Sequence, residues 1–147
     1  MPERASGTVL AFDFGAKRIG VAIGESLLGG ARALTSIVAT DRATRIKRIA
    51  ELIATWQPCS LALGLPLRAD GSDSAMTARC RRFARQLESR FGLPVHLVDE
   101  RYSSVEADAR LAALGHDWRT RKQEVDAAAA AIILQDYFDG ENHRHAV

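Results

Sequence analysis

Two short apolar runs near the start of the chain have the pattern of β-strands. Side chains along residues 8–14 alternate between two faces, with Leu10, Phe12 and Phe14 on one and Val9, Ala11 and Asp13 on the other. A second run, "RIGVAIGE" at 18–25, follows after the short link "GAK". So short a link joins antiparallel neighbours, and we therefore expect a β-hairpin in which Gly15 and Gly20 permit tight backbone.

The rest of the chain alternates between strand-like runs and helical spacing of apolar residues. In chain order we expect a third short strand at 34–39, a helix over 41–56, a buried strand at 60–66, a helix ending at Gly92, a strand at 94–100, a helix from Ser103 to about Gly115, and a last helix from Thr120 to about Asp139. Capping-box patterns open the last two helices.

This element order predicts an α/β fold. A β-hairpin meander followed by βαβ crossovers gives a mixed five-stranded sheet with helices on both faces. A chain of 147 residues can bury one full hydrophobic core, and nothing in it reads as a linker. We therefore expect a single domain over 1–147, with flexible ends at about 1–6 and 140–147.

Composition narrows the cellular setting. The apolar run after the first residues is short and is interrupted by Asp13, so it predicts neither a signal peptide nor a membrane span. Cys59 and Cys80 lack the spacing of a metal site or a redox motif. These features favour a reduced, cytoplasmic protein with no membrane partner.

Charge distribution is more informative than the net charge of +2. Basic residues gather at 42–48, 79–85 and 119–122. Such clusters can track the phosphate backbone of a nucleic acid. They can equally be the solvated faces of helices, and the sequence leaves both interpretations open.

Three carboxylates occupy positions that suggest chemistry. Asp13 lies in the first strand, Glu100 closes the last strand, and Asp126 lies early in the final helix. If the first strand runs parallel to the last two, Asp13 and Glu100 approach the same sheet edge. Grouped carboxylates repel unless a cation neutralises them, and hard oxygen ligands suit Mg²⁺ or Mn²⁺. Each acid also has a structural alternative, such as an ion pair of Asp13 with Lys17 or Arg18.

Four motifs together resemble one family. "AFDFGAKRIGVAIGE", "LALGLPLRADGS", "LVDERYSSVEA" and "KQEVDAAAAAIILQDYF" occur in this order over nearly the whole chain. The set is similar to the YqgF family, Holliday-junction-resolvase-like proteins with an RNase H-like fold. The resemblance implies a nuclease that processes the 5′ end of pre-16S ribosomal RNA by two-metal phosphodiester hydrolysis, with Mg²⁺ or Mn²⁺ as cofactor.

The resemblance also implies which residues act. Asp13, Glu100 and Asp126 are the catalytic and metal-binding candidates. An acid near the fourth strand is common in the wider RNase H-like fold, so Asp70 remains an alternative to Glu100. The substrate-binding candidates are basic or hydroxyl side chains beside these acids or in the basic clusters: Lys17, Arg18, Arg79, Arg101, Ser103 and Lys122.

Other functions stay open at this point. The substrate is structured RNA or branched DNA, and the ribosome or an assembly factor is a further candidate partner. A DNA-junction resolvase and a non-catalytic RNA-binding assembly factor are alternatives to the rRNA nuclease. "DFGAKRIGVA" also resembles the phosphate-binding hairpin of actin-like ATPases, although we expect the two lobes of such an enzyme to need a longer chain.

Overall fold

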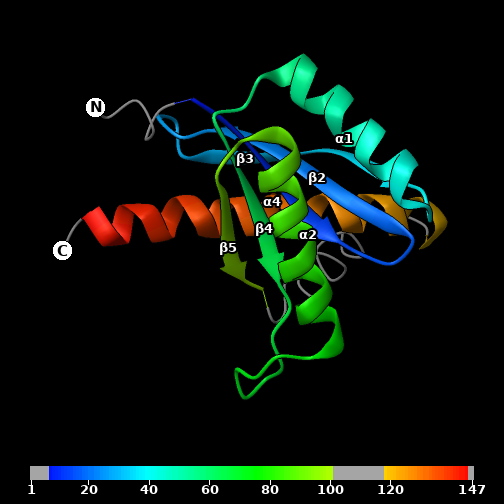
Figure 1. The fold of residues 1–147 in the computed structure, drawn as a ribbon. Helices are drawn as coiled ribbons and strands as arrows, with labels where there is room; N and C mark the ends of the chain where they lie inside the picture. The colour runs from blue at the N-terminus through cyan, green and yellow to red at the C-terminus, as the bar shows by residue number, and fades with distance from the viewer. Residues whose placement is uncertain (1–6, 101–117, 146–147) are drawn as a thin grey trace.

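One mixed five-stranded sheet forms the centre of the molecule. The structure, a computed structural model, describes residues 7–100 and 118–145, with side chains described over 7–100 and 125–140. The strands are β1 (Thr8–Phe14), β2 (Arg18–Glu25), β3 (Gly30–Val38), β4 (Ser60–Leu65) and β5 (Val95–Asp99). The helices are α1 (Arg42–Trp56), α2 (Ala75–Phe91) and α4 (Trp118–His145). The order across the sheet is β3-β2-β1-β4-β5 (Figure 1).

Strand direction follows the connections. β1 pairs antiparallel with β2, and β2 antiparallel with β3. β1 runs parallel to β4, which the chain reaches through β2, β3 and α1, and β4 runs parallel to β5 because α2 connects the two. The predicted hairpin and mixed sheet are confirmed. The carboxyl ends of β1, β4 and β5 therefore share one edge of the sheet.

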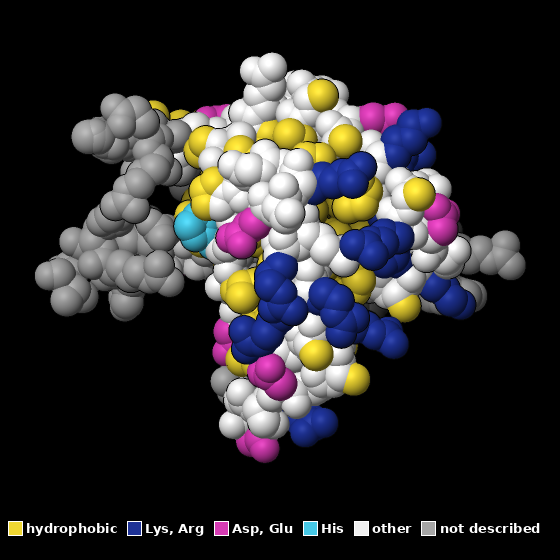
Figure 2. Space-filling view, in the orientation of Figure 1, with side chains coloured by type: hydrophobic (Ala, Val, Ile, Leu, Met, Phe, Trp, Pro, Cys, Tyr) yellow, Lys and Arg dark blue, Asp and Glu magenta, His cyan; other side chains and the backbone are white. Residues whose placement is uncertain are grey.

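Helices cover both faces of this sheet. α1 and α2 pack on the face that carries Leu10 and Phe12 of β1. α4 packs on the opposite face, against Val9 and Ala11 of the same strand. The strict alternation along β1 thus supplies one apolar surface to each helical layer. Figure 2 looks onto the side of α1 and α2, where Lys and Arg side chains gather around exposed hydrophobic surface.

Local capping fixes where the first two helices begin and end. The Asp41 side chain accepts a hydrogen bond from the backbone of Thr44 and caps α1. Ser74 caps α2 through a capping box with Thr77. Gly92 ends α2 in the left-handed conformation, at φ 67°, as its position in the sequence predicts.

Two predicted boundaries differ from the structure by more than two residues. β3 begins at Gly30 rather than at residue 34, because its ladder with β2 continues through small residues that show no alternation. α4 runs from Trp118 to His145 and passes through Gly140, which the sequence suggested as a stop. A glycine inside a helix costs only about 1 kcal/mol, which a long packed helix tolerates. The predicted helix over 103–115 lies outside the described residues.

Within the part of the chain that the structure describes, no helix is long and apolar enough to cross a membrane.

Candidate functional site

Asp13 lies one residue before the carboxyl end of β1. It pairs with Gly20 of β2, and alternation along β1 places its side chain on the α4 side of the sheet. The next residue, Phe14, packs on the opposite side with the α1 and α2 core. The end of β1 therefore presents a carboxylate to one face of the sheet and an aromatic ring to the other.

Glu100 is placed against the neighbouring parallel strand. Its backbone N–H donates to the carbonyl of Leu65, at the end of β4, over 3.1 Å. The residue is buried. Its side chain lies where a side chain on Gly64 would stand, since a Cβ there would be 2.5 Å from the Glu100 Cγ. Glycine at position 64 thus leaves the space that Glu100 occupies.

The other acids considered beside Glu100 lie elsewhere. Asp70 is exposed in the loop before α2, and its carboxylate accepts hydrogen bonds from the backbone N–H and hydroxyl of Ser72. Asp99 is exposed, in keeping with alternation along β5. Of these three acids, Glu100 is the one whose charge acts on Asp13.

The approach of α4 to the sheet positions Asp126. A Cβ built on Gly20 would stand 1.8 Å from the Asp126 carbonyl oxygen, so no side chain fits at position 20. Gly20 does not have a positive φ. The sequence assigned this glycine to the turn of the hairpin, whereas the structure shows that it admits the backbone of α4. The sequence does show a small residue in the strand that pairs with the one carrying Asp13. It does not show that a helix far along the chain crosses the sheet at that residue.

Asp126 is held by an ion pair. Arg18 Nε donates to Asp126 Oδ2 over 2.5 Å, and the Ser36 hydroxyl donates to the same oxygen over 3.4 Å. Both members of the ion pair are only partly exposed. Arg18, expected to contact phosphate, is thus the electrostatic partner of a candidate metal-binding acid.

The three acids influence one another electrostatically. Burial, and after it the negative charges of Glu100 and Asp126, together raise the pKa of Asp13 to about 8. The site therefore favours one additional positive charge near Asp13, either a proton or a cation. This coupling is the strongest indication that the three residues form one site.

The three carboxylates are suitable ligands for a hard divalent cation, but in the structure they do not lie close enough together to bind one. Carboxylate oxygens are the ligands that Mg²⁺ prefers. Among the described residues, no group of three or more His, Cys, Asp or Glu side chains is close enough to hold a metal ion. Asp126 instead faces Arg18. Binding a cation would require the carboxylates to approach one another.

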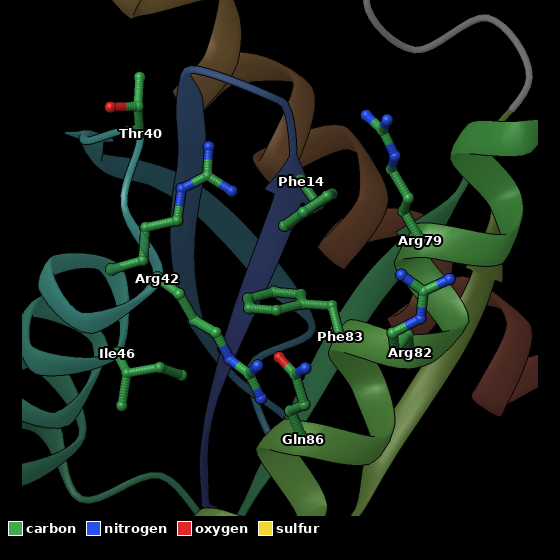
Figure 3. Close-up of a pocket in the computed structure, with 9 residues that line it drawn as sticks. Phe14, Thr40, Arg42, Ile46, Arg79, Arg82, Phe83 and Gln86 are labelled. Atoms are coloured by element: carbon green, nitrogen blue, oxygen red, sulfur yellow. The ribbon is translucent and has the colours of Figure 1, made fainter.

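The substrate-binding candidates are not all brought to this edge. Lys17 is exposed in the link between β1 and β2. Arg79 lies on α2, on the other side of the sheet, in a pocket with Phe14 and Phe83 (Figure 3). Arg101 and Ser103 lie outside the described residues, as does the side chain of Lys122.

Arg45 has a structural role that the sequence did not reveal. Its guanidinium donates to the carbonyls of Ala39 and Gly15, each over 2.8 Å, and to that of Ala16. It also lies over the Phe14 ring, 5.2 Å from the centroid. The sequence placed this residue in a basic cluster, but the structure uses it to fix the β1–β2 turn to α1. The turn that follows Asp13 is therefore anchored.

The family follows from comparison with known proteins. Residues 7–140 match the RuvX family model, described as a Holliday junction resolvase. The chain belongs to the RuvX family. This confirms the expected family, since RuvX and YqgF denote the same group.

Similar proteins cover almost the full length of the chain. One from Methylobacillus flagellatus is 54% identical over 143 residues, covering 95% of this chain and 98% of the relative. One from Burkholderia vietnamiensis is 51% identical over 139 residues, covering 94% and 93%. Both carry the name "Putative pre-16S rRNA nuclease".

Solved structures support the fold. Thermus thermophilus RuvC, in complex with a Holliday junction substrate, matches with a TM-score of 0.54 at 19% identity, over 92% of this chain and 96% of RuvC. A second structure of Thermus thermophilus RuvC matches with a TM-score of 0.53 at 18% identity and the same coverage. The predicted RNase H-like α/β fold is confirmed.

Proposed function

We propose that this RuvX-family chain is a metal-dependent endonuclease that hydrolyses phosphodiester bonds in the 5′ region of pre-16S rRNA. The observation that carries the proposal is that the negative charges of Glu100 and Asp126 both act on Asp13, near the carboxyl end of β1. Family membership and the names of relatives about half identical to the chain support the same activity.

The residues divide the work between holding a cation and holding the substrate. Asp13, Glu100 and Asp126 would hold one or two Mg²⁺ or Mn²⁺ ions, which in nucleases supply activation of the attacking water and charge stabilisation at the leaving oxygen. β1 and its anchored turn fix Asp13, and Gly64 leaves the space for Glu100. Arg18 forms an ion pair with Asp126, which a bound cation would also neutralise.

Phosphate contacts complete the proposed site. Lys17 is exposed on the link that follows Asp13, within the same hairpin, and its ammonium group would bind a phosphate flanking the scissile bond. We retain Arg101, Ser103 and Lys122 as further substrate-binding residues, as the family resemblance implies. Arg79 belongs to the other side of the sheet and would contact a more distant part of the substrate.

Branched DNA is the second candidate substrate. The family description names the Holliday junction, and the RuvC neighbour was solved with one. RNA comes first because the relatives named for pre-16S rRNA are 51–54% identical to this chain, whereas RuvC is 19% identical. Cytoplasmic action, on the ribosome or with an assembly factor, follows from an rRNA substrate.

A side-by-side cleavage assay separates these functions. Purified wild-type protein is incubated with pre-16S rRNA and with a four-way DNA junction, each with Mg²⁺ and with EDTA. We expect cleavage of the RNA that requires Mg²⁺. Cleavage of the junction alone would replace the RNA substrate with DNA. Binding of RNA without cleavage of either substrate would contradict the nuclease and favour the assembly factor.

A further inference from the structure

A basic groove lies between α1 and α2, on the face of the sheet opposite the carboxylates. Two adjoining pockets of about 210 and 550 Å³ make up this α1–α2 groove. They share Arg42 and Ile46 from α1 and Arg82 and Gln86 from α2. Figure 3 shows Arg42 on one side of the first pocket and Arg79 and Arg82 on the other.

The lining of the groove is strongly cationic. Neither pocket contains an Asp or a Glu among its lining residues. Apart from Arg45, which binds the β1–β2 turn, five arginines line it: Arg42, Arg79, Arg82, Arg85 and Arg90. Several are visible as the dark blue surface over α2 and beside it (Figure 2). A chain with a net charge of only +2 thus concentrates positive charge in one groove.

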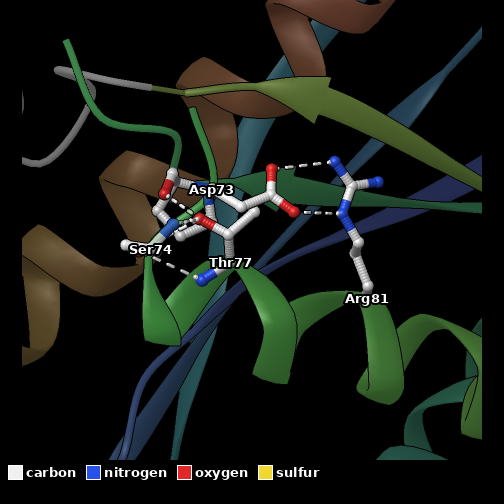
Figure 4. A network of polar contacts seen from close by, with 5 residues as sticks. Asp73, Ser74, Thr77 and Arg81 are labelled. Carbon is white, nitrogen blue, oxygen red and sulfur yellow. Dashed lines mark hydrogen bonds and ion pairs between the residues drawn. The ribbon is translucent and has the colours of Figure 1, made fainter. Parts of the chain in front are cut away.

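These five guanidinium groups lack protein partners within the described side chains. By contrast, Arg18 pairs with Asp126. Arg81, on the same helix as most of the groove, pairs with Asp73 through two hydrogen bonds beside the α2 cap (Figure 4). The arginines that hold the fold together therefore have acceptors, and those of the groove remain available to an external anion.

The spacing along α2 makes these charges a stripe. Arg79, Arg82 and Arg90 share a helix face with Gln86, at intervals of three or four residues. The span from 79 to 90 is about 16 Å at the rise of an α-helix. Like charges so close together destabilise a helix. The phosphates of a nucleic acid strand relieve this repulsion at several points.

Aromatic surface at one end suggests contact with a base. The partly buried ring of Phe14 lines the first pocket beside the buried ring of Phe83, with their centroids 4.7 Å apart. Phe14 directly follows Asp13 and faces the other side of the sheet, so this end of the groove and the candidate site lie across the end of β1 from each other. Aromatic side chains contact unpaired bases, whereas bases in a duplex are stacked on one another. An acidic protein segment would satisfy the arginines but offers no such complement to the rings.

We propose that the α1–α2 groove binds a single-stranded RNA segment that flanks the cleaved position, with its phosphates on the arginines and an unpaired base against Phe14. This inference rests on the proposed function for the identity of the nucleic acid. The groove is a second binding surface, on the face of the sheet opposite the carboxylates. The RNA strand would pass around the end of β1 between the two.

The test measures RNA binding with the charge of the groove reduced. Fluorescence anisotropy of a short labelled single-stranded RNA, in EDTA and over a series of KCl concentrations, compares R82Q/R85Q with K47Q/R48Q, two exposed positions on α1. The control removes the same charge from outside the groove. We expect R82Q/R85Q to bind roughly tenfold more weakly, and the slope of log K against log salt to fall by about 1.4, since each lost phosphate contact contributes about 0.7. Equal affinity and slope in the two variants would overturn the proposal.

Two further arms sharpen the result. A duplex of the same sequence should lose less affinity than the single strand in R82Q/R85Q, and an equal loss would overturn the single-strand assignment. Because EDTA removes the cation, the binding result does not depend on cleavage. If wild-type protein fails to cleave RNA while R82Q/R85Q still binds it more weakly than the control, the proposed nuclease function is wrong. RNA binding in the α1–α2 groove is then still supported.

Discussion

The backbone of α4 lies directly against β2 where Asp126 meets Gly20. A Cβ on Gly20 would stand 1.8 Å from the Asp126 carbonyl oxygen and 3.0 Å from the Ala127 nitrogen. Gly20 is also the antiparallel partner of Asp13. One small residue thus lets the final helix bring its carboxylate to the strand that carries Asp13.

Gly20→Ala should therefore damage the fold. The nearest atoms belong to helix backbone, which cannot move aside as a flexible side chain can. We expect a loss of at least about 2–3 kcal/mol in the free energy of unfolding, measured by urea denaturation. Gly30→Ala is the matched control, because its Cβ would meet nothing within 4 Å and its φ is not positive. A Gly20 variant as stable as the Gly30 variant would contradict this packing.

Arg18→Gln should destabilise the cation-free protein. The change leaves Asp126 partly buried beside two other acids without its ion-pair partner. For a pair of intermediate exposure we expect a loss of about 1–2 kcal/mol in EDTA. Added Mg²⁺ should recover more stability in this variant than in wild type. Thermal denaturation with and without Mg²⁺ measures both effects, with Lys47→Gln as an exposed control of equal charge. A variant that behaves like this control would show that the ion pair contributes nothing.

Arg45→Leu should act through stability rather than through RNA. Three backbone carbonyls around the β1–β2 turn lose their charged donor. We expect a loss of about 2–4 kcal/mol in the free energy of unfolding, against little change in Lys47→Leu. The salt dependence of RNA binding should stay that of wild type at temperatures where the variant is folded. A lower salt slope in a stable variant would instead make Arg45 a phosphate contact.

Stability without a cation should fall as the pH rises. The pKa of Asp13 is raised from 3.8 to about 8 by burial and by its acidic neighbours, so the folded state holds a proton that the unfolded state releases. This contribution is fully present below about pH 4 and is lost as the pH rises to about 8. Asp13→Asn, which stays neutral, should match wild type at low pH and become the more stable protein near pH 8 in EDTA. Urea denaturation across this range measures the difference, and a constant difference would contradict the raised pKa.

The hairpin and the sheet could be predicted because the pattern of the sequence and the packing agree. Both predicted hairpin strands, 8–14 and 18–25, have the bounds found in the structure. Alternation along β1 is unambiguous because both faces are covered. β3 was predicted too short because Ala31 and Ala33 join its ladder without a hydrophobic signal.

The site could be predicted only in part. The parallel strands place Asp13 and Glu100 at one edge, which follows from topology. The ion-pair partner of Arg18 could not be predicted from the sequence. The sequence suggested Asp13, whereas Arg18 binds Asp126. The crossing of α4 over Gly20 and the space at Gly64 depend on contacts between distant segments, which local patterns do not encode.

Cleavage of pre-16S rRNA by Asp13→Asn tests the central claim most directly. The variant keeps the shape of the side chain and removes the carboxylate on which the other two acids act. Asp70→Asn is the matched control, since Asp70 is an exposed acid whose carboxylate accepts hydrogen bonds from the neighbouring Ser72. With Mg²⁺ present, we expect Asp13→Asn to lose at least about a hundredfold in cleavage rate, as loss of a catalytic electrostatic group typically does, while remaining folded. Asp70→Asn should cleave like wild type. Equal cleavage by Asp13→Asn and wild type would contradict the proposed site.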